Sequence, residues 1–274
     1  MKIVDARVRL RTECLLKDWT IEIKPYFKDY IELYKMKTRL TPIPVEEFII
    51  LVKKSGIEKM IVSGRNREEN EHIKEIAGSF NEIIPVGGVD ICDGILSALK
   101  EIKRCCDEEY AAIYLSPFIS KLDADHKSFY AIYGLCELLQ KPIIIHGSIH
   151  FWRGAYMWHG SPQCIDRIAV DFPELKIIVS HGGNGFGPPI LAVTQRHPNI
   201  YLEFSALRPK YMAPEFIQAA NTYLKKRCLF GTDYPLVEFE EAINLWKYAI
   251  REEVWQLFFY QNALEALYDD PIPF

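Results

Sequence analysis

Residues 175–183 of the chain read LKIIVSHGG, an apolar run that ends in a histidine and two glycines. Two similar stretches stand on either side of it, PIIIHGS at residues 142–148 and RCLFGTDYP at residues 227–235. Short, mostly apolar and β-branched runs are typical of parallel strands that are buried on both faces of a sheet. We therefore expect a parallel sheet, and the polar residues at the ends of these three strands are His146, His181 and Asp233.

Five further segments have the same character, so the chain carries eight predicted strands. Amphipathic segments separate them, and in one of these Val45, Phe48, Ile49 and Val52 recur at the spacing of a buried helix face. Eight strands, each followed by a helix, give the order of a (β/α)₈ TIM barrel. The predicted strands span residues 3–10, 59–63, 83–90, 111–116, 142–147, 175–181, 200–205 and 228–233, and predicted helices include 126–140, 162–172, 214–225, 238–250 and 252–268.

An open, doubly wound α/β sheet is the alternative architecture, but no glycine-rich phosphate loop follows the first predicted strand. The 274 residues also suit one barrel, so we predict a single TIM-barrel domain over residues 1–274. Residues 11–44, which are rich in Tyr, Phe and Lys, interrupt the alternation of strands and helices. We predict that they form an insertion after the first strand, as a lid or rim.

Charge and composition exclude several classes of protein. The 33 basic and 37 acidic side chains nearly balance, which argues against nucleic-acid binding through phosphate neutralisation. No apolar stretch is long enough to cross a bilayer, and the first ten residues lack the apolar run of a signal peptide. Seven cysteines without a CxxC pair are typical of reduced thiols. We expect a cytoplasmic protein that binds neither nucleic acid nor membrane.

The polar strand ends are candidates for a catalytic site. Residues at the carboxyl-terminal ends of barrel strands face the active-site end of the fold. Two imidazoles and a carboxylate, from His146, His181 and Asp233, are ligand types that hold a catalytic divalent metal. A single histidine at a strand end more often makes only a hydrogen bond. Three such residues on different strands favour a metal site.

The order of motifs resembles a known family. These motifs are SFYAIYGLCELLQKPIIIHGS, PQCIDRIAVDFPELKIIVSHGG, HPNIYLEFSA, RCLFGTDYP and FYQNALEAL, which follow one another between residues 128 and 267. Together they resemble the amidohydrolase superfamily, and within it the amidohydrolase-2 branch with the aminocarboxymuconate-semialdehyde decarboxylase-like enzymes. The resemblance is in register over most of residues 125–268 and looser over residues 1–100.

The resemblance implies a metal-dependent barrel enzyme that hydrolyses or non-oxidatively decarboxylates a small, carboxylate-bearing substrate. It implies a divalent metal, with zinc as our expectation, and metal ligands at His146, His181 and Asp233. In that branch the strand-six histidine, here His181, often moves protons or activates water. His181 and Asp233 are therefore the catalytic candidates.

One element of the family pattern is replaced. Where the resemblance implies an HxH pair of metal ligands, the chain reads Arg7-Val8-Arg9. A guanidinium offers only donors, so it cannot coordinate a cation, and its charge repels one. A metal could still bind through the remaining three ligands. Alternatively, Arg7 and Arg9 bind an anionic ligand in a metal-free enzyme or in a relative without catalysis, or they turn away to pair with Glu13 at the rim.

Other positions complete the set of candidates. Residues 150–159 follow the fifth predicted strand and contain Trp152 and Arg153, which could bind a flat or anionic ligand or pack as a lid. Arg208 is a further candidate for a substrate carboxylate. Asp90 could serve in a variant of the metal site. The aromatic-rich insertion and the resemblance favour a homodimer, and three histidines are expected to be structural or exposed: His72, His126 and His197.

Overall fold

The computed structural model describes residues 1–20, 31–32, 35–150 and 154–268. In this part of the chain, eight strands form one sheet in sequence order, and every neighbouring pair is parallel. The strands are β1 (Val4–Asp5), β2 (Lys59–Ser63), β3 (Ile83–Val89), β4 (Ile113–Leu115), β5 (Ile143–His146), β6 (Ile177–Ser180), β7 (Ile200–Glu203) and β8 (Cys228–Leu229).

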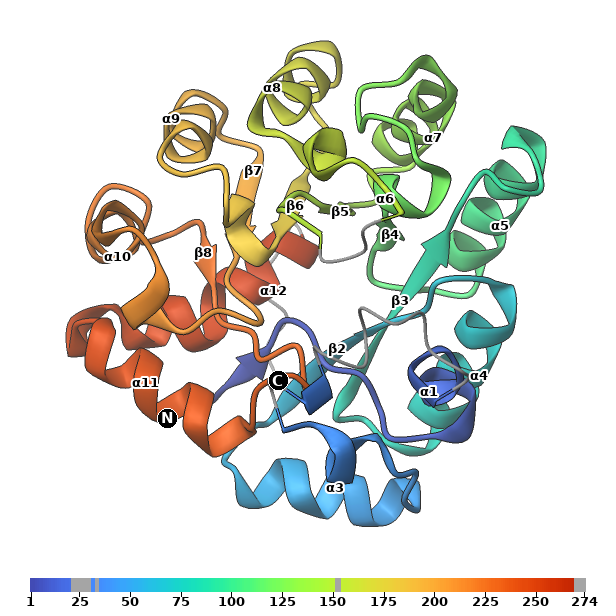
Figure 1. The fold of residues 1–274 in the computed structure, drawn as a ribbon. Coiled ribbons are helices and arrows are strands. Elements are labelled where there is room, and N and C mark those ends of the chain that lie inside the picture. Colours follow the sequence, from blue (N-terminus) through green and yellow to red (C-terminus); the bar gives the residue numbers. More distant parts are fainter. Residues whose placement is uncertain (21–30, 33–34, 151–153, 269–274) are drawn as a thin grey trace.

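The first and last strands lie side by side and close the sheet into a barrel. The amide of Ala6 donates to the carbonyl of Phe230 at 2.9 Å, and a parallel bridge joins Val8 to Tyr234. Helices surround the ring of strands (Figure 1). The predicted (β/α)₈ barrel is therefore confirmed.

The helices follow the strands in the order expected for this fold. They are α1 (Glu13–Thr20), α3 (Val45–Lys54), α4 (Arg67–Ser79), α5 (Ile95–Asp107), α6 (Pro117–Ser120), α7 (Lys127–Leu138), α8 (Pro162–Asp171), α9 (Pro189–Arg196), α10 (Pro214–Asn221), α11 (Phe239–Ala249) and α12 (Asn262–Leu267). Short 3₁₀ turns occur at Lys37–Leu40, Met157–Gly160, His181–Gly183, Pro209–Tyr211 and Glu252–Val254. Pro162 and Pro214 each begin a helix, where the missing amide hydrogen has no cost.

The core is divided between the inside and the outside of the barrel. Ile144 of β5 packs with Ile178 of β6 in a small cluster that draws on all eight strands, or on the residues directly beside them, and lines the barrel interior. Its neighbours Ile143 and Ile145 belong to the larger cluster that includes the helices. This alternation is the two-residue period of a strand, and it determines which side chains face the barrel axis.

The carboxyl-terminal part differs from the expected single helix over residues 252–268. A 3₁₀ turn is followed by a π-helical turn at Leu257–Gln261 and then by α12. The carbonyl of Phe258 accepts a hydrogen bond from the amide of Phe230 at 3.0 Å. The hydrogen bond to the residue after β8 therefore competes with regular helical hydrogen bonding at Phe258. Because this contact joins residues that are distant in the sequence, the local hydrophobic pattern could not predict it.

Three further expectations concern the insertion, the cysteines and the length of the helices. Of the predicted insertion over 11–44, the structure describes α1 and the turn at Lys37–Leu40, while residues 21–30 and 33–34 lie outside the described part. All seven cysteines are free thiols. Among the described residues, no helix has both the length and the apolar character needed to cross a membrane.

Candidate active site at the carboxyl-terminal mouth of the barrel

Polar side chains occupy the inward-facing positions where the strands end, at what we call the mouth of the barrel. His146 ends β5 two residues after the barrel-lining Ile144, and Ser180 ends β6 two residues after Ile178. Glu203 is the last residue of β7. Because side chains alternate along a strand, His146 and Ser180 share the inward face of their apolar predecessors. Their location is the one at which barrel enzymes carry their catalytic residues.

Arg7 extends from the end of β1 across the mouth. Its Nε donates to Asp233 Oδ1 at 3.0 Å, its Nη2 to the Tyr114 hydroxyl at 3.2 Å and its Nη1 to Ser180 Oγ at 3.4 Å. The acceptors lie on or just after β8, β4 and β6, so one guanidinium connects widely separated strands. The Arg7 and Asp233 side chains are only 11% and 16% exposed, which makes their ion pair mostly buried.

The backbone holds both partners of this ion pair in place. The buried carboxylate of Asp5 accepts the amide hydrogens of Arg7 at 3.2 Å and Thr232 at 2.9 Å, and also the Thr232 hydroxyl at 2.6 Å. The Asp233 amide donates to the Arg7 carbonyl at 2.9 Å. Burial raises the pKa of Asp5 to about 7, although the bonds from Thr232 and Arg7 act in the opposite direction. Asp5 thus joins the end of β1 to the segment after β8.

His181 follows β6 in the left-handed backbone region, with φ of 58°. Its Nδ1 lies 3.0 Å from Ser205 Oγ and 3.2 Å from the Ser205 carbonyl oxygen. Because a carbonyl can only accept, this arrangement favours the tautomer with hydrogen on Nδ1, which leaves Nε2 as the basic nitrogen. His181 therefore has the character of a proton acceptor or donor at Nε2.

The second imidazole lies next to the first, in a more apolar environment. The ring centroids of His146 and His181 are 4.7 Å apart, and Phe118 packs edge-on to His146 at 5.0 Å and stacks on His150 at 4.8 Å. Burial, followed by the charges of His181, His150 and Arg7, lowers the pKa of His146 well below its usual value. Burial lowers the pKa of His150 to about 4, and His181 and Arg7 add to the effect. Both rings are therefore neutral near pH 7.

Glu203 adds a buried carboxyl group beside these residues. Its Oε1 accepts the Ser205 amide hydrogen, whereas Oε2 has no hydrogen-bond partner within the described part of the chain. Burial raises the pKa of Glu203, and the nearby positive charges of His181 and Arg7 oppose that rise. The Glu203–Ser205 bond fixes the turn that contacts His181, so Glu203 helps to position the imidazole.

Arg9 supplies a second positive charge near Arg7. Its amide donates to the Tyr234 carbonyl at 2.9 Å, and its Nη1 is 3.5 Å from the Leu15 carbonyl oxygen. Burial and the neighbouring charge of Arg65 lower the pKa of Arg9 to about 10, with Glu69 opposing and Arg7 contributing. Arg9 therefore remains protonated at neutral pH.

The structure brings together part of the predicted set. Arg7 contacts Asp233 directly, and His146 contacts His181, within one group at the mouth. Arg208 instead forms an ion pair with Glu241 at 2.7 Å. The remaining predicted ligand-binding residues, Trp152 and Arg153, lie outside the described residues.

The three histidines that were expected to be structural or exposed make local contacts, and so does Asp90. His72 contacts Thr12, His126 caps the start of α7, and His197 pairs with Asp166 at 2.7 Å. Asp90 accepts the amide hydrogen of Cys92 at 2.7 Å and so supports a turn after β3. The residues that sequence reasoning missed at the mouth are Ser180, Glu203 and Phe118, whereas Ser205 ends one of the predicted strands.

A divalent metal does not fit the mouth as its side chains are arranged. Across the described residues, no group of three or more His, Cys, Asp and Glu side chains is placed to hold a metal ion. Asp233 Oδ1, on one of the predicted ligands, already accepts a hydrogen bond from the positively charged guanidinium of Arg7. The guanidinium repels a cation and cannot coordinate one. The predicted metal set of His146, His181 and Asp233 thus remains a prediction without support from this donor geometry.

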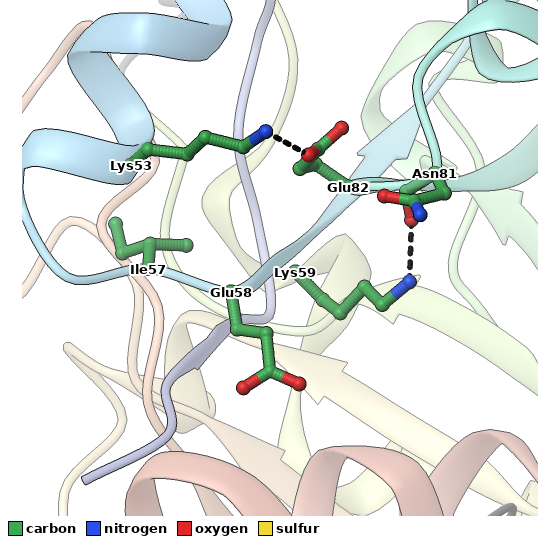
Figure 2. A pocket seen from close by; sticks show the side chains of 6 residues that line it. All are labelled: Lys53, Ile57, Glu58, Lys59, Asn81 and Glu82. Carbon is green, nitrogen blue, oxygen red and sulfur yellow. Dashed lines mark hydrogen bonds and ion pairs between the residues drawn. The ribbon is translucent and has the colours of Figure 1, made fainter. Parts of the chain in front are cut away.

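A surface pocket of about 450 Å³ lies at the opposite end of the barrel (Figure 2). Lys59 and Glu82 flank the amino-terminal starts of β2 and β3, and Lys53 of α3 pairs with Glu82 at 2.5 Å. Lys59 Nζ donates to the Asn81 carbonyl at 2.5 Å. Because this end of a barrel carries stability rather than catalysis, the mouth is the better candidate for chemistry.

Comparison with known proteins identifies the family. The amidohydrolase family model matches residues 55–268, and the chain belongs to this family. The predicted resemblance to the amidohydrolase-2 branch is therefore confirmed. A search of curated proteins found none that matches.

Solved structures resemble the chain along nearly all of its length. An uncharacterised TIM-barrel protein from Bordetella bronchiseptica is 24% identical, with a TM-score of 0.82, and the match covers 97% of this chain and 98% of that one. The 5-carboxyvanillate decarboxylase of Sphingomonas paucimobilis is 13% identical, with a TM-score of 0.71 and coverage of 97% and 98%. A dihydroxybenzoic acid decarboxylase from Polaromonas with bound manganese is 16% identical, with a TM-score of 0.68 and coverage of 96% and 97%. At these identities the likeness shows the fold.

Proposed function

We propose that the chain is an enzyme that non-oxidatively decarboxylates a small, flat carboxylic acid at the mouth of the barrel. The observation that carries the proposal is the buried guanidinium of Arg7 beside the imidazoles of His146 and His181. The decarboxylases among the similar structures support the same class of reaction. Hydrolysis is the other reaction that the family admits, and it requires an activated water.

Arg7 and Arg9 supply the positive charge for substrate binding. The described contacts of Arg7 use three of the five N–H groups of a guanidinium, so further donors are available to a carboxylate. Arg9 adds charge in the same region and remains protonated. The neutral rings of His146 and His150, which pack against the buried Phe118, offer flat surfaces on which a planar acid can stack.

His181 handles the proton in this scheme. When the carbon–carboxylate bond breaks, carbon dioxide leaves and the electron pair remains on the substrate carbon. The imidazolium of His181 then donates the Nε2 proton to that carbon, and the neutral ring recovers a proton from water. The Ser205 contacts at Nδ1 keep Nε2 available for this transfer.

Two alternative functions predict different results in the test described below. A metal-dependent enzyme, with zinc or manganese at His146, His181 and Asp233, is favoured by the manganese in the Polaromonas structure. It would require Arg7 to leave Asp233. A metal-free relative without catalysis would bind an anion through Arg7 and Arg9 and release it unchanged.

For the intact protein, a cytoplasmic location and a homodimer remain proposals.

The reaction can be tested with acids named for the similar enzymes. The protein is incubated in D₂O with 5-carboxyvanillate, with 2,6-dihydroxybenzoate, for which a further similar solved structure is named, and with unsubstituted aromatic acids. We expect release of carbon dioxide and one deuterium at the vacated carbon of the product. The His181→Asn variant is the matched control, because asparagine tolerates the left-handed backbone, and it should bind the acid but lose at least about a hundredfold in turnover.

Other results would redirect the assignment. Saturable binding of the acids without carbon dioxide release would indicate the binding protein. Cleavage of an amide or lactone panel without decarboxylation would indicate a hydrolase. Activity that appears only with added Mn²⁺ or Zn²⁺ would indicate the metal enzyme.

A further inference from the structure

The guanidinium of Arg7 lies where several oxygen acceptors converge. Its three hydrogen bonds end on a carboxylate, a phenol and a serine hydroxyl, from Asp233, Tyr114 and Ser180. The Arg7 carbon Cζ also lies 4.8 Å from the centroid of the Tyr114 ring. Anionic and polar oxygens gathered around one point form a site for a cation, and a side chain of this protein supplies that cation.

Hydrogen bonds at both the amide and the carbonyl of Arg7 hold its backbone in place. The amide hydrogen of Arg7 goes to Asp5, and its carbonyl accepts from the Asp233 amide. The side chain then meets the Asp233 carboxylate as well, so backbone and side chain contact the same residue. Arg7 is only 9% exposed. A movement of the guanidinium to the rim would break these side-chain contacts together and leave Asp233 without its described ion-pair partner.

A second cation at this place would conflict with these contacts. A divalent ion on Asp233 would share its carboxylate with the guanidinium, and the two positive charges would repel each other at short range. The imidazoles of His146 and His181 carry no negative charge that could offset that repulsion. Among the residues that the structure describes, no group of three or more His, Cys, Asp and Glu side chains is placed to hold a metal ion.

We propose that Arg7 is the permanent cation of this site and that the protein binds its anionic ligand without a divalent metal. The ligand class rests on the proposed function, whereas the absence of a metal requirement can be measured without any substrate. A built-in guanidinium cannot be removed by a chelator and does not lose its charge at working pH.

The first experiment measures the unaltered protein, purified without a histidine tag. We expect less than about a tenth of an equivalent of bound Mn, Fe or Zn per chain. We also expect that calorimetry detects no saturable one-to-one binding of Mn²⁺ at the Mn²⁺ concentrations that saturate metal-dependent enzymes. Benzoate serves as the carboxylate probe, and benzamide as its uncharged control. The dissociation constant of benzoate should change by less than about twofold after treatment with EDTA and dialysis.

The second experiment asks whether Arg7 is what excludes the ion. Arg7→His places an imidazole beside Asp233 and His181, and we expect at least about tenfold tighter binding of Mn²⁺ or Zn²⁺ than in the parent. Arg208→His makes the same change in an ion pair at the rim and should leave metal binding as in the parent. Arg7→Lys keeps the charge and should also remain metal-free.

Clear outcomes would overturn the proposal. A tightly bound equivalent of metal in the parent would do so, as would a loss of benzoate affinity greater than about tenfold with EDTA. Equal metal affinity of the folded Arg7→His variant and the parent would also contradict it. If Arg7→His does not fold, the measurements on the parent and on Arg7→Lys decide the question. A failure of the decarboxylation assay would leave all these metal measurements unchanged, so the two proposals fail separately.

Discussion

At the scale of single residues, the mouth depends on one mostly buried ion pair. Removing charges from water is costly, and the attraction between Arg7 and Asp233 offsets that cost only while both partners are present. Tyr114 and Ser180 provide further acceptors for the guanidinium. The loss of either charged partner would leave the other mostly buried without an opposite charge.

Asp233→Asn tests this dependence. The variant keeps the size and the left-handed backbone of Asp233, with φ of 53°, but removes the charge opposite Arg7. We expect the free energy of unfolding to fall by about 3 kcal/mol. Urea denaturation of the variant and the parent measures the difference.

Glu241→Gln is the control for that prediction. It removes the charge from the ion pair with Arg208, in which the two side chains are 20% and 41% exposed. The expected loss is below about 1 kcal/mol, because solvent screens the pair. Equal losses in the two variants would contradict the view that the Arg7 pair is the structurally important one.

The raised pKa of Glu203 predicts that the stability of the protein depends on pH. Burial raises the pKa of its carboxyl above the ordinary value of 4.5, so the folded protein retains this proton after the unfolded chain has released it. The stabilising contribution is therefore present below the ordinary pKa and is lost as pH rises through the raised one. We expect the stability of the parent, relative to Glu203→Gln, to decrease in urea titrations as pH rises above the ordinary carboxyl range.

Glu82 provides a control of opposite sign. Its carboxyl is partly desolvated, which raises the pKa, but the hydrogen bond from Lys53 and the charges of Lys53 and Lys59 outweigh burial and lower it overall. The parent should therefore lose stability relative to Glu82→Gln as pH falls through the ordinary carboxyl range. The same trend with pH in both variants would show that the assignment for Glu203 is wrong.

At the scale of elements, the sequence carried most of the information about the strands. Apolar runs such as LKIIVSHGG predict β6 and its histidine, because a buried parallel strand is apolar on both faces. The pattern did not separate inward from outward positions, since both faces are apolar. Ser180 and Glu203 were missed for this reason. They can be recognised as inward-facing only after barrel-lining residues such as Ile144 and Ile178 have been assigned to the interior.

Tertiary contacts account for what the patterns could not predict. The direction of the Arg7 side chain depends on Asp233, which is 226 residues away, and not on the nearby Glu13 that was considered as a partner. The π-helical turn at Leu257–Gln261 likewise involves a contact between Phe258 and Phe230. Local periodicity contains neither contact.

The start of α12 is predicted to stabilise β8. Asn262 is fully buried, and its Nδ2 donates to the carbonyls of Lys225 and Cys228 at 2.8 and 2.7 Å. Asn262→Ala leaves both carbonyls without this donor and should lower the free energy of unfolding by about 2 kcal/mol. The exposed neighbour offers a control, because Gln261→Ala should change it by less than about 0.5 kcal/mol in the same urea series. Similar losses in both variants would contradict a specific role for Asn262.

At the scale of the whole molecule, the two ends of the barrel carry different groups of side chains. The amino-terminal end carries the pocket with the Lys53–Glu82 pair (Figure 2). The mouth gathers Arg7, His146 and His181. Barrel closure between Ala6 and Phe230 brings the first and last strands together. This closure is what places Arg7 opposite Asp233, so the site exists only in the complete barrel.

One crystal structure would test the central claim most directly. The protein would be crystallised with 3-bromobenzoate in the presence of Mn²⁺, and anomalous scattering would locate both bromine and manganese. Our account predicts the carboxylate within hydrogen-bond distance of the Arg7 guanidinium, with Arg7 still paired to Asp233 and no manganese at the mouth. A manganese ion coordinated by His146, His181 and Asp233, with Arg7 displaced, would contradict it.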